Sequence, residues 1–196
     1  KMALKGQKFL NECKIFNNLQ EAIFDCDLVL ASCGRVEIGK DSSFDLPEDI
    51  SRWIRSINKI NNLAVLFGRE DRGLTNQELL FAHRIFTIPT SKNYSSLNIS
   101  HAVAVILYEL KKSSKNIPKK DIEIFNLASS KQINDSFMEV EEMLKRVGYL
   151  LTHTSRSKIS KFKKYILRAN TSSNEMNVLR GIVHQINWFL DNSKKL

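Results

Sequence analysis

The sequence predicts an α/β protein, in which a parallel sheet is flanked by helices, followed by a helical C-terminal region. As far as residue 112, short apolar runs that suit strands alternate with runs that suit helices. This alternation is typical of a parallel sheet with helices on both faces. After a polar stretch at 113–132, only helical patterns follow. We therefore expect a sheet-containing domain over 1–112, a linker over 113–132 and a small all-α domain over 133–196.

The N-terminal residues carry patterns for a helix over 2–12, a strand over 14–16, a helix over 19–24 and a strand over 28–31. Asn17 or Asn18 precedes the second of these helices and suits its N-cap. The run LVLA at 28–31 is apolar without alternation, which is typical of a strand covered on both faces.

The middle of the chain carries patterns for a helix over 47–60, strands over 63–67 and 84–88, and helices over 77–82 and 95–110. Pro47 suits the first turn of its helix, and Thr75 suits the cap of the helix that begins at 77. We expect Ser95 or Ser96 to cap the last helix, which is nearly apolar over 102–107 and is therefore predicted to be buried.

Three helices are expected after the linker, over 133–147, 157–169 and 173–192. Gly148 is placed to end the first of them, because glycine readily takes the left-handed conformation that closes many helices. Ser172 or Ser173, shortly before Glu175, predicts a capped start for the last helix.

The charge is concentrated in the C-terminal half. The formal net charge is +9, with 15 Lys/Arg against 13 Asp/Glu in residues 1–112 and 15 against 8 in residues 113–196. A basic region of this kind favours a polyanionic partner, above all nucleic acid, although solvated basic helices also occur without one. No apolar run is long enough to predict a membrane span. The three cysteines include no CxxC pair, which favours reduced thiols and a cytoplasmic location.

Three polar loops follow the three buried strands, at 32–35, 68–73 and 89–96. The carboxyl ends of parallel strands meet at one sheet edge, where ligands of open α/β sheets bind. The loops therefore predict a ligand site, although any parallel sheet must have loops at that edge. The loop at 68–73 has no GxGxxG or GxxxxGK[ST] pattern, and its charged residues could equally form a solvated turn. No Ser-His-acid order or metal-ligand cluster is present, so we expect neither a hydrolase nor a metal site.

A basic cluster lies in the second C-terminal helix. Its six cations fall within thirteen residues and are Arg156, Lys158, Lys161, Lys163, Lys164 and Arg168. They alternate with apolar residues such as Ile159 and Phe162, which mark the packed face and leave the cations outward. We predict that these cations contact RNA phosphates, the alternative being a merely solvated face.

Two motifs resemble a known family. Residues 67–79 (FGREDRGLTNQEL) are similar to the second signature of the SpoU branch of SPOUT RNA methyltransferases, and residues 88–102 are similar to the third. The order and separation of the motifs also agree with that family. The resemblance is strongest to the TrmJ-like subgroup, which methylates a ribose 2′-hydroxyl in the tRNA anticodon loop. Residues 174–182 resemble part of that subgroup's helical C-terminal extension.

The resemblance implies a deep trefoil knot formed by residues 63–110, S-adenosylmethionine as cofactor, and a homodimer whose active site draws on both subunits. It implies cofactor contacts at Ser32, Cys33, Gly34, Gly68, Ile88, Ser95, Ser96 and Leu97. It places Glu70, Ser96 and Asn98 near the reacting centre, and Arg35 is a further cation at the same edge that we assign to RNA binding. RNA, with tRNA ahead of rRNA, is the implied partner.

One family feature has no counterpart in this sequence. The family's first signature, an Asn and an Arg after the first strand, is not found, and residues 1–12 match the region that follows it. We therefore expect this sequence to be a truncated copy that lacks the first strand and helix, and to bind cofactor with little methyl transfer, because a hydroxyl needs activation to act as a nucleophile. A non-catalytic RNA-binding protein on the same scaffold and a non-RNA nucleotide-binding protein are the alternatives.

Overall fold

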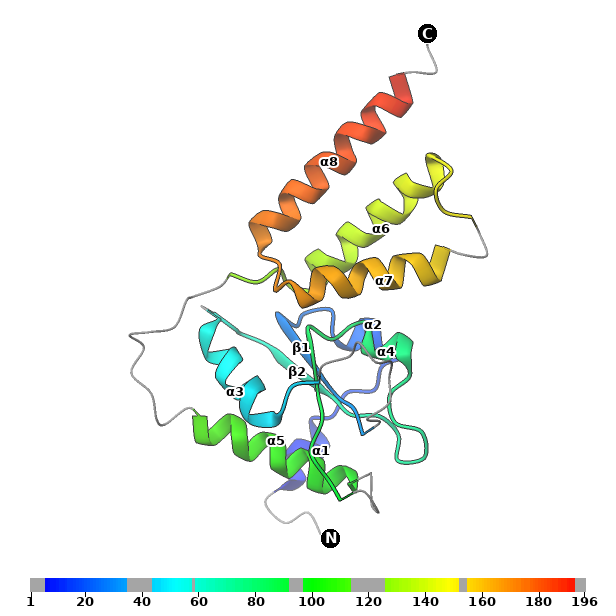
Figure 1. Ribbon diagram of the computed structural model, residues 1–196. Helices are drawn as coiled ribbons and strands as arrows, with labels where there is room; N and C mark the ends of the chain where they lie inside the picture. The colour runs from blue at the N-terminus through cyan, green and yellow to red at the C-terminus, as the bar shows by residue number, and fades with distance from the viewer. Residues whose placement is uncertain are drawn as a thin grey trace.

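A three-stranded parallel sheet lies at the centre of the N-terminal part (Figure 1). The computed structural model describes residues 6–34, 44–57, 59–91, 97–113, 126–151 and 155–192. The strands are β1 (Leu28–Ser32), β2 (Leu63–Leu66) and β3 (Arg84–Phe86), in the order β2-β1-β3. Leu28 pairs with Leu63, and Leu30 pairs with Arg84, both in parallel register. The predicted parallel sheet is confirmed.

Helices cover both faces of the sheet, because the side chains of the central strand alternate between two cores. Val29 and Ala31 of β1 pack in one cluster with residues at α2 (Leu19–Ala22) and α4 (Asn76–Leu79). Leu30 packs in the other, with Ile50 of α3 (Pro47–Ser56) and Ile106 of α5 (Ile99–Ser113). The first four residues of β1 are buried, as its unalternated apolar sequence predicts.

Local capping signals read from the sequence are present in the structure. The side chain of Asn18 accepts a hydrogen bond from the Glu21 N–H and so caps α2. Thr75 and Glu78 form a reciprocal capping box at α4. Ser172 and Glu175 make the same reciprocal pair of bonds at the start of α8 (Ser173–Asn192). These bonds satisfy amide groups that a helix start otherwise leaves unpaired.

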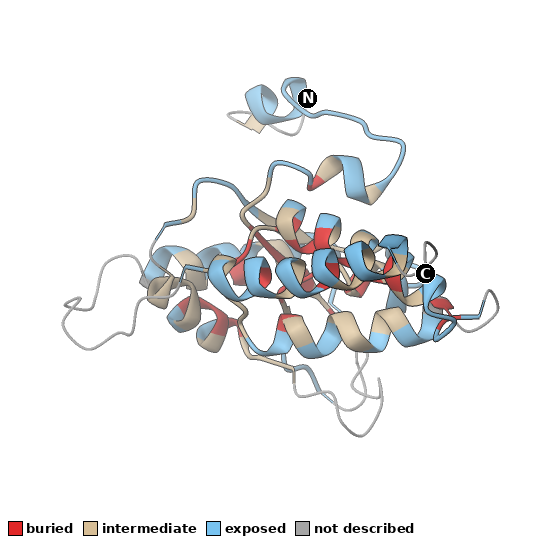
Figure 2. Ribbon diagram, turned by 90° about the horizontal axis from the view of Figure 1, so that it is seen from above, coloured by how far each residue is buried: buried red, intermediate tan, exposed pale blue. Residues whose placement is uncertain are grey.

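Several predictions about the N-terminal residues and α5 are wrong. Residues 14–16 form no strand, and Ile15 is 99% exposed. The helix α1 (Gln7–Asn11) is shorter than expected and has no buried residue; Figure 2 shows it standing apart from the other elements. Helix α5 is not buried over 102–107, because Ile106 alone in that range is buried, while Leu107 is exposed.

Three helices form the C-terminal part: α6 (Ser130–Arg146), α7 (Ser155–Arg168) and α8. Helix α6 begins three residues before the predicted start, because Ser129 caps it through the Gln132 N–H. It ends at Gly148, whose φ of 76° allows the Tyr149 N–H to bond the Leu144 carbonyl. The buried faces of the three helices meet in shared clusters that contain Phe137 and Val183.

The C-terminal helices are joined to the sheet by buried polar contacts. The Nδ1 atom of His83 accepts a hydrogen bond from the Val29 N–H at 3.1 Å, and its Nε2 lies 3.2 Å from the Ala128 carbonyl oxygen. With both contacts made, the ring is neutral and Nε2 carries the proton. Burial lowers the pKa of His83, which favours the same neutral form. Among the residues the structure describes, no helix has the length and apolarity needed to cross a membrane.

Candidate active site

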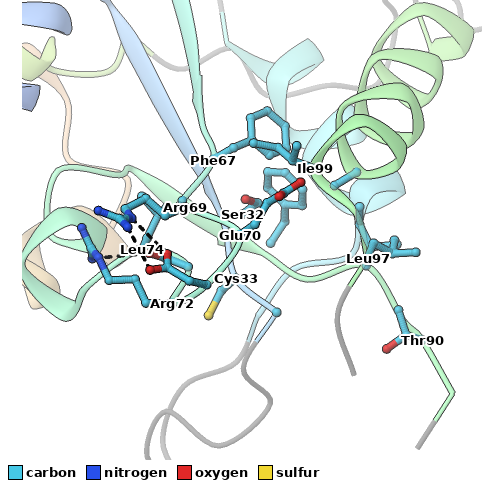
Figure 3. A pocket seen from close by; sticks show the side chains of 17 residues that line it. Ser32, Cys33, Phe67, Arg69, Glu70, Arg72, Leu74, Thr90, Leu97 and Ile99 are labelled. Carbon is cyan, nitrogen blue, oxygen red and sulfur yellow. Dashed lines mark hydrogen bonds and ion pairs between the residues drawn. The ribbon is translucent and has the colours of Figure 1, made fainter. Parts of the chain in front are cut away.

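A cavity of about 350 Å³ lies at the carboxyl ends of the three strands (Figure 3). Residues that follow β1, β2 and β3 line it together with the first turn of α5. Its walls combine apolar side chains with glycines and the charged residues of the loop after β2. The three loops therefore meet at one edge, as parallel strand topology requires.

Six of the eight predicted cofactor residues line this cavity, namely Ser32, Cys33, Gly34, Gly68, Ile88 and Leu97. The other two, Ser95 and Ser96, lie outside the described residues. The Ser32 hydroxyl donates a hydrogen bond to the Leu66 carbonyl at 3.1 Å, and the Cys33 N–H donates to the Phe86 carbonyl at 2.9 Å. These bonds tie the end of β1 to both neighbouring strands. The role of the six residues as cofactor contacts stays a prediction.

The loop after β2 folds back on itself at Gly68. A Cβ atom at Gly68 would lie 2.0 Å from the Gly73 carbonyl carbon and 2.2 Å from the Leu74 nitrogen, which no side chain can tolerate. Gly73 has φ +68°, and its N–H bonds the Arg69 carbonyl at 2.8 Å. The two glycines therefore allow the two arms of the loop to come into backbone contact beside the cavity.

Ion pairs within this loop leave one carboxylate unengaged. Arg69 binds Asp71 through two hydrogen bonds of 2.9 and 3.0 Å, and Arg72 lies 3.3 Å from Glu78. Glu78 also accepts from the Thr75 N–H and hydroxyl, and these bonds lower the pKa of Glu78 to about 2. Glu70 makes no hydrogen bond or ion pair with any other described residue, and it lines the cavity.

The start of α5 differs from the prediction. Helix α5 begins at Ile99, and Asn98 caps it: its Oδ1 accepts from the Ser100 N–H at 2.9 Å and from the Ser100 hydroxyl at 2.7 Å. The predicted caps, Ser95 and Ser96, lie outside the described residues. Asn98 is exposed and is not among the residues that line the cavity. Its neighbours Ile99 and Ala102 do line it.

Some lining residues were not predicted. Ile99 and Ala102 stand three positions apart, a spacing that places both on one side of a helix and could have signalled a shared face. Phe67 also lines the cavity, and its place at the end of the apolar run of β2 was the available signal. Thr90, another lining residue, belongs to the predicted loop at 89–96 but was not singled out there. The described residues contain no group of three or more His, Cys, Asp or Glu side chains placed to hold a metal ion.

The predicted RNA-binding cations do not share one environment. Lys161, Lys164 and Arg168 are exposed and line a second cavity between α7 and the sheet. Lys158 is exposed and donates to the Tyr149 carbonyl at 3.2 Å. Arg35 and the side chain of Arg156 lie outside the described residues.

Lys163 differs from the neighbouring lysines because its side chain is enclosed between two parts of the protein. Its ammonium donates to the Asn134 Oδ1 at 2.6 Å and lies 4.7 Å from the ring centroid of Phe81. Burial lowers the pKa of Lys163 to about 8. Its helix position adjoins those of the exposed lysines, but its side chain bridges α6 and the residues after α4.

An α/β sheet with a ligand cavity at its carboxyl edge and a basic helical extension is an arrangement suited to an enzyme acting on a polyanion. The sequence matches the SpoU rRNA Methylase family over residues 1–108, and residues 131–195 match the C-terminal domain of the tRNA methyltransferase TrmJ. The chain therefore belongs to the SpoU methylase family, in its TrmJ-like subgroup.

Similar proteins come from bacteria and archaea. A tRNA (cytidine-2′-O-)-methyltransferase TrmJ of Methanocaldococcus jannaschii is 31% identical over 89% of this chain and 75% of its own length. An uncharacterized tRNA/rRNA methyltransferase of Haemophilus influenzae is 28% identical over 97% of this chain and 78% of its own. The crystal structure of TrmJ from Z. mobilis ZM4 has a TM-score of 0.75 and 24% identity over 92% of this chain and 76% of that one, which shows a shared fold.

Proposed function

We propose that the protein is an enzyme that transfers a methyl group from S-adenosylmethionine to a ribose 2′-hydroxyl of tRNA, in the anticodon loop. Because the 196-residue sequence has no counterpart of the family's first signature, we expect its own rate of transfer to be low. The observation that carries this proposal is the cavity at the sheet edge, which the two SpoU motifs build with Gly68, Glu70, Ile88 and Leu97. The named tRNA 2′-O-methyltransferases among the similar proteins support the reaction and the substrate.

The residues of the cavity suit this cofactor. Its volume of about 350 Å³ is in the range of small-molecule sites. Gly68 leaves a backbone surface without a side chain, which a ligand can approach closely. Phe67, Leu97 and Ile99 offer apolar contact for an adenine ring, and Glu70 offers a negative charge to a cationic sulfonium or ammonium group. When bound, the cofactor supplies an electrophilic methyl group on its sulfonium.

The chain's own residues would then position the ribose and exclude water. Ser32 and Cys33 are tied to the neighbouring strands by a hydroxyl and a backbone hydrogen bond, and with Gly34 they form one wall of the cavity. We assign Glu70, Ser96 and Asn98 to the reacting centre. Among the described residues the Glu70 carboxylate has no partner, so it can accept a hydrogen bond from an incoming hydroxyl. The side-chain oxygen of Asn98 is held by the cap of α5, which leaves its amide N–H₂ to donate.

The finer architecture also belongs to this proposal. We assign a deep trefoil knot to residues 63–110. We also assign the chain between α5 and α6 to a linker, and the part that begins with α6 to a helical RNA-binding unit. We propose a homodimer that uses the exposed apolar side chains of α5, of which Leu107 and Tyr108 are examples. Lys158, Lys161, Lys164 and Arg168 are proposed to contact RNA phosphates, with Arg35 and the Arg156 side chain as further candidates. An enzyme acting on tRNA of this type would work in the cytoplasm.

The test is tritium transfer from labelled S-adenosylmethionine into bulk tRNA, with rRNA in a parallel reaction, after calorimetry has measured cofactor binding. We expect Glu70→Gln and Asn98→Ala to lower transfer about tenfold or more, since each removes one polar group that this proposal assigns to the reacting centre. Glu48→Gln removes an exposed carboxylate from the first turn of α3, outside the cavity, and should leave transfer unchanged.

The outcomes separate the alternatives. Absence of cofactor binding would refute the assignment of the cavity. Binding of cofactor and tRNA without transfer would favour the non-catalytic RNA-binding alternative, and incorporation into rRNA alone would redirect the substrate.

A further inference from the structure

A second cavity, of about 300 Å³, lies between the sheet and α7. The sheet-containing N-terminal part, which we call the body, contributes residues around α4 and β3, including Leu79, Leu80 and Ile85. Helix α7 contributes Lys161, Lys164, Tyr165, Leu167 and Arg168. The cavity is separate from the one at the carboxyl edge of the sheet, and no residue lines both. We call it the junction cleft.

One wall of the junction cleft carries an excess of positive charge. Lys161, Lys164 and Arg168 stand at positions i, i+3 and i+7, and therefore share one side of α7. All three are exposed, and none makes an ion pair with another described residue. A row of unpaired cations repels itself, and a bound anion relieves that repulsion.

The other charged pair in the cleft is already neutral. Arg84 binds Asp45 at 3.1 Å and donates to the Asn170 Oδ1 at 3.2 Å, and its guanidinium lies 4.6 Å from the centroid of the Trp53 ring. Arg84 is therefore a structural link between β3 and the end of α7. The net positive charge of the cleft comes from α7.

An exposed aromatic ring accompanies these cations. Tyr165 is 60% exposed, and the guanidinium of Arg168 lies 5.5 Å from its ring centroid. Opposite, Leu79, Leu80 and Ile85 form an apolar surface on the body. A cationic row beside an exposed ring, with an apolar surface across the gap, is how proteins hold an unstacked base together with its phosphates.

We propose that the junction cleft binds a single-stranded nucleotide of the RNA substrate, with the base against Tyr165 and the flanking phosphates on Lys161, Lys164 and Arg168. This inference rests on the proposed action on RNA and adds a second RNA subsite, remote from the cofactor cavity. Regular duplex RNA would bring phosphates to α7 but no accessible base face to Tyr165. An acidic protein segment would satisfy the cations but would not need the ring.

The experiment measures binding of fluorescein-labelled hexauridylate to the full chain by fluorescence anisotropy, over a series of salt concentrations. We expect Tyr165→Ala to weaken binding about tenfold, and Tyr165→Phe to bind like wild type because the ring remains. Each of Lys161→Ala, Lys164→Ala and Arg168→Ala should reduce the slope of log K against log salt by about 0.7. Lys145→Ala removes one charge from α6 outside the cleft and should change the dissociation constant less than about twofold.

Three outcomes would overturn the proposal: wild-type affinity in Tyr165→Ala, equal competition by polyglutamate, or equal binding of a blunt RNA duplex. Thermal melting of each variant checks that it folds. The tritium assay separates this proposal from the proposed function. If wild type methylates tRNA while Tyr165→Ala keeps full oligonucleotide affinity, the subsite is refuted and the function stands. If wild type transfers no methyl group while Tyr165→Ala loses hexauridylate binding, the function is refuted and the subsite stands.

Discussion

Replacing Gly68 by alanine tests whether the loop after β2 depends on backbone contact. The added Cβ would lie 2.0 and 2.2 Å from backbone atoms of Gly73 and Leu74, whereas ordinary contact begins at 3.4 Å. Backbone atoms cannot rotate away as a flexible side chain can. The two arms of the loop must therefore separate by roughly 1 Å or more, as overpacked sites do.

The cost follows from this displacement. Overpacking typically costs about 1–3 kcal/mol, and for a chain of this size each kcal/mol lowers the melting temperature by about 2–4 °C. We therefore expect Gly68→Ala to melt about 2–12 °C below wild type. Because Glu70 lies in the displaced loop, S-adenosylmethionine affinity should fall as well, by about tenfold or more for a misplacement of this size.

Differential scanning calorimetry measures the first effect and isothermal titration the second. Gly181→Ala is the matched control, because a Cβ there meets no atom within 4 Å and the residue lies inside α8. Alanine is favoured over glycine within a helix by about 0.5–1 kcal/mol, so this variant should melt slightly above wild type. A Gly68→Ala protein with wild-type melting temperature and cofactor affinity would show that the loop does not depend on this contact.

Three further predictions concern groups whose pKa the fold changes, each followed by urea denaturation across a pH series. His83 is held neutral in the fold but takes up a proton in the unfolded chain below about pH 6.5, so the free energy of unfolding should fall as pH drops through that value. His83→Gln should flatten this dependence, and an unchanged profile would contradict the link to Ala128. Lys163 has a pKa of about 8 in the fold against an ordinary value of 10.5, so the free energy of unfolding should rise between these pH values by up to about 3 kcal/mol. A rise that persists in Lys163→Met would come from another group. Glu78 has a pKa of about 2 in the fold, so its contribution to stability is present above about pH 4.5 and is lost as pH falls toward 2. Glu78→Ala should destabilise the protein by about 1 kcal/mol at pH 7, and an unchanged stability would show that the bonds to Thr75 contribute nothing.

Much of the secondary structure could be predicted because its signals are local. The capping boxes at Thr75 and Ser172 and the helix end at Gly148 depend on residues no more than five positions apart. The parallel sheet followed from the order of apolar runs, since strands separated by helices pair in parallel. The meeting of three loops at one edge is a consequence of that topology.

Local signals were insufficient where a distant partner decides the environment. Residues 14–16 have a strand-like composition, yet Ile15 is exposed because no described strand pairs with that segment. Lys163 follows the same helical pattern as Lys161 and Lys164, but Asn134 of α6 and Phe81 of the body enclose it. Helix α5 begins at Ile99, later than predicted, and Asn98 caps it.

By itself, the sequence determined the α/β class, the parallel sheet, the caps of α2, α4 and α8, the basic C-terminal helices and the motifs that mark the family. Only the tertiary structure decided which groups meet. It placed Gly68 against Gly73, gave Glu70 no partner among the described residues at the cavity, enclosed Lys163 and formed the junction cleft. The physical reason is range: helix caps and strand periodicity are properties of neighbouring residues, whereas burial, ion pairing and cavities arise from chain segments that folding brings together from far apart.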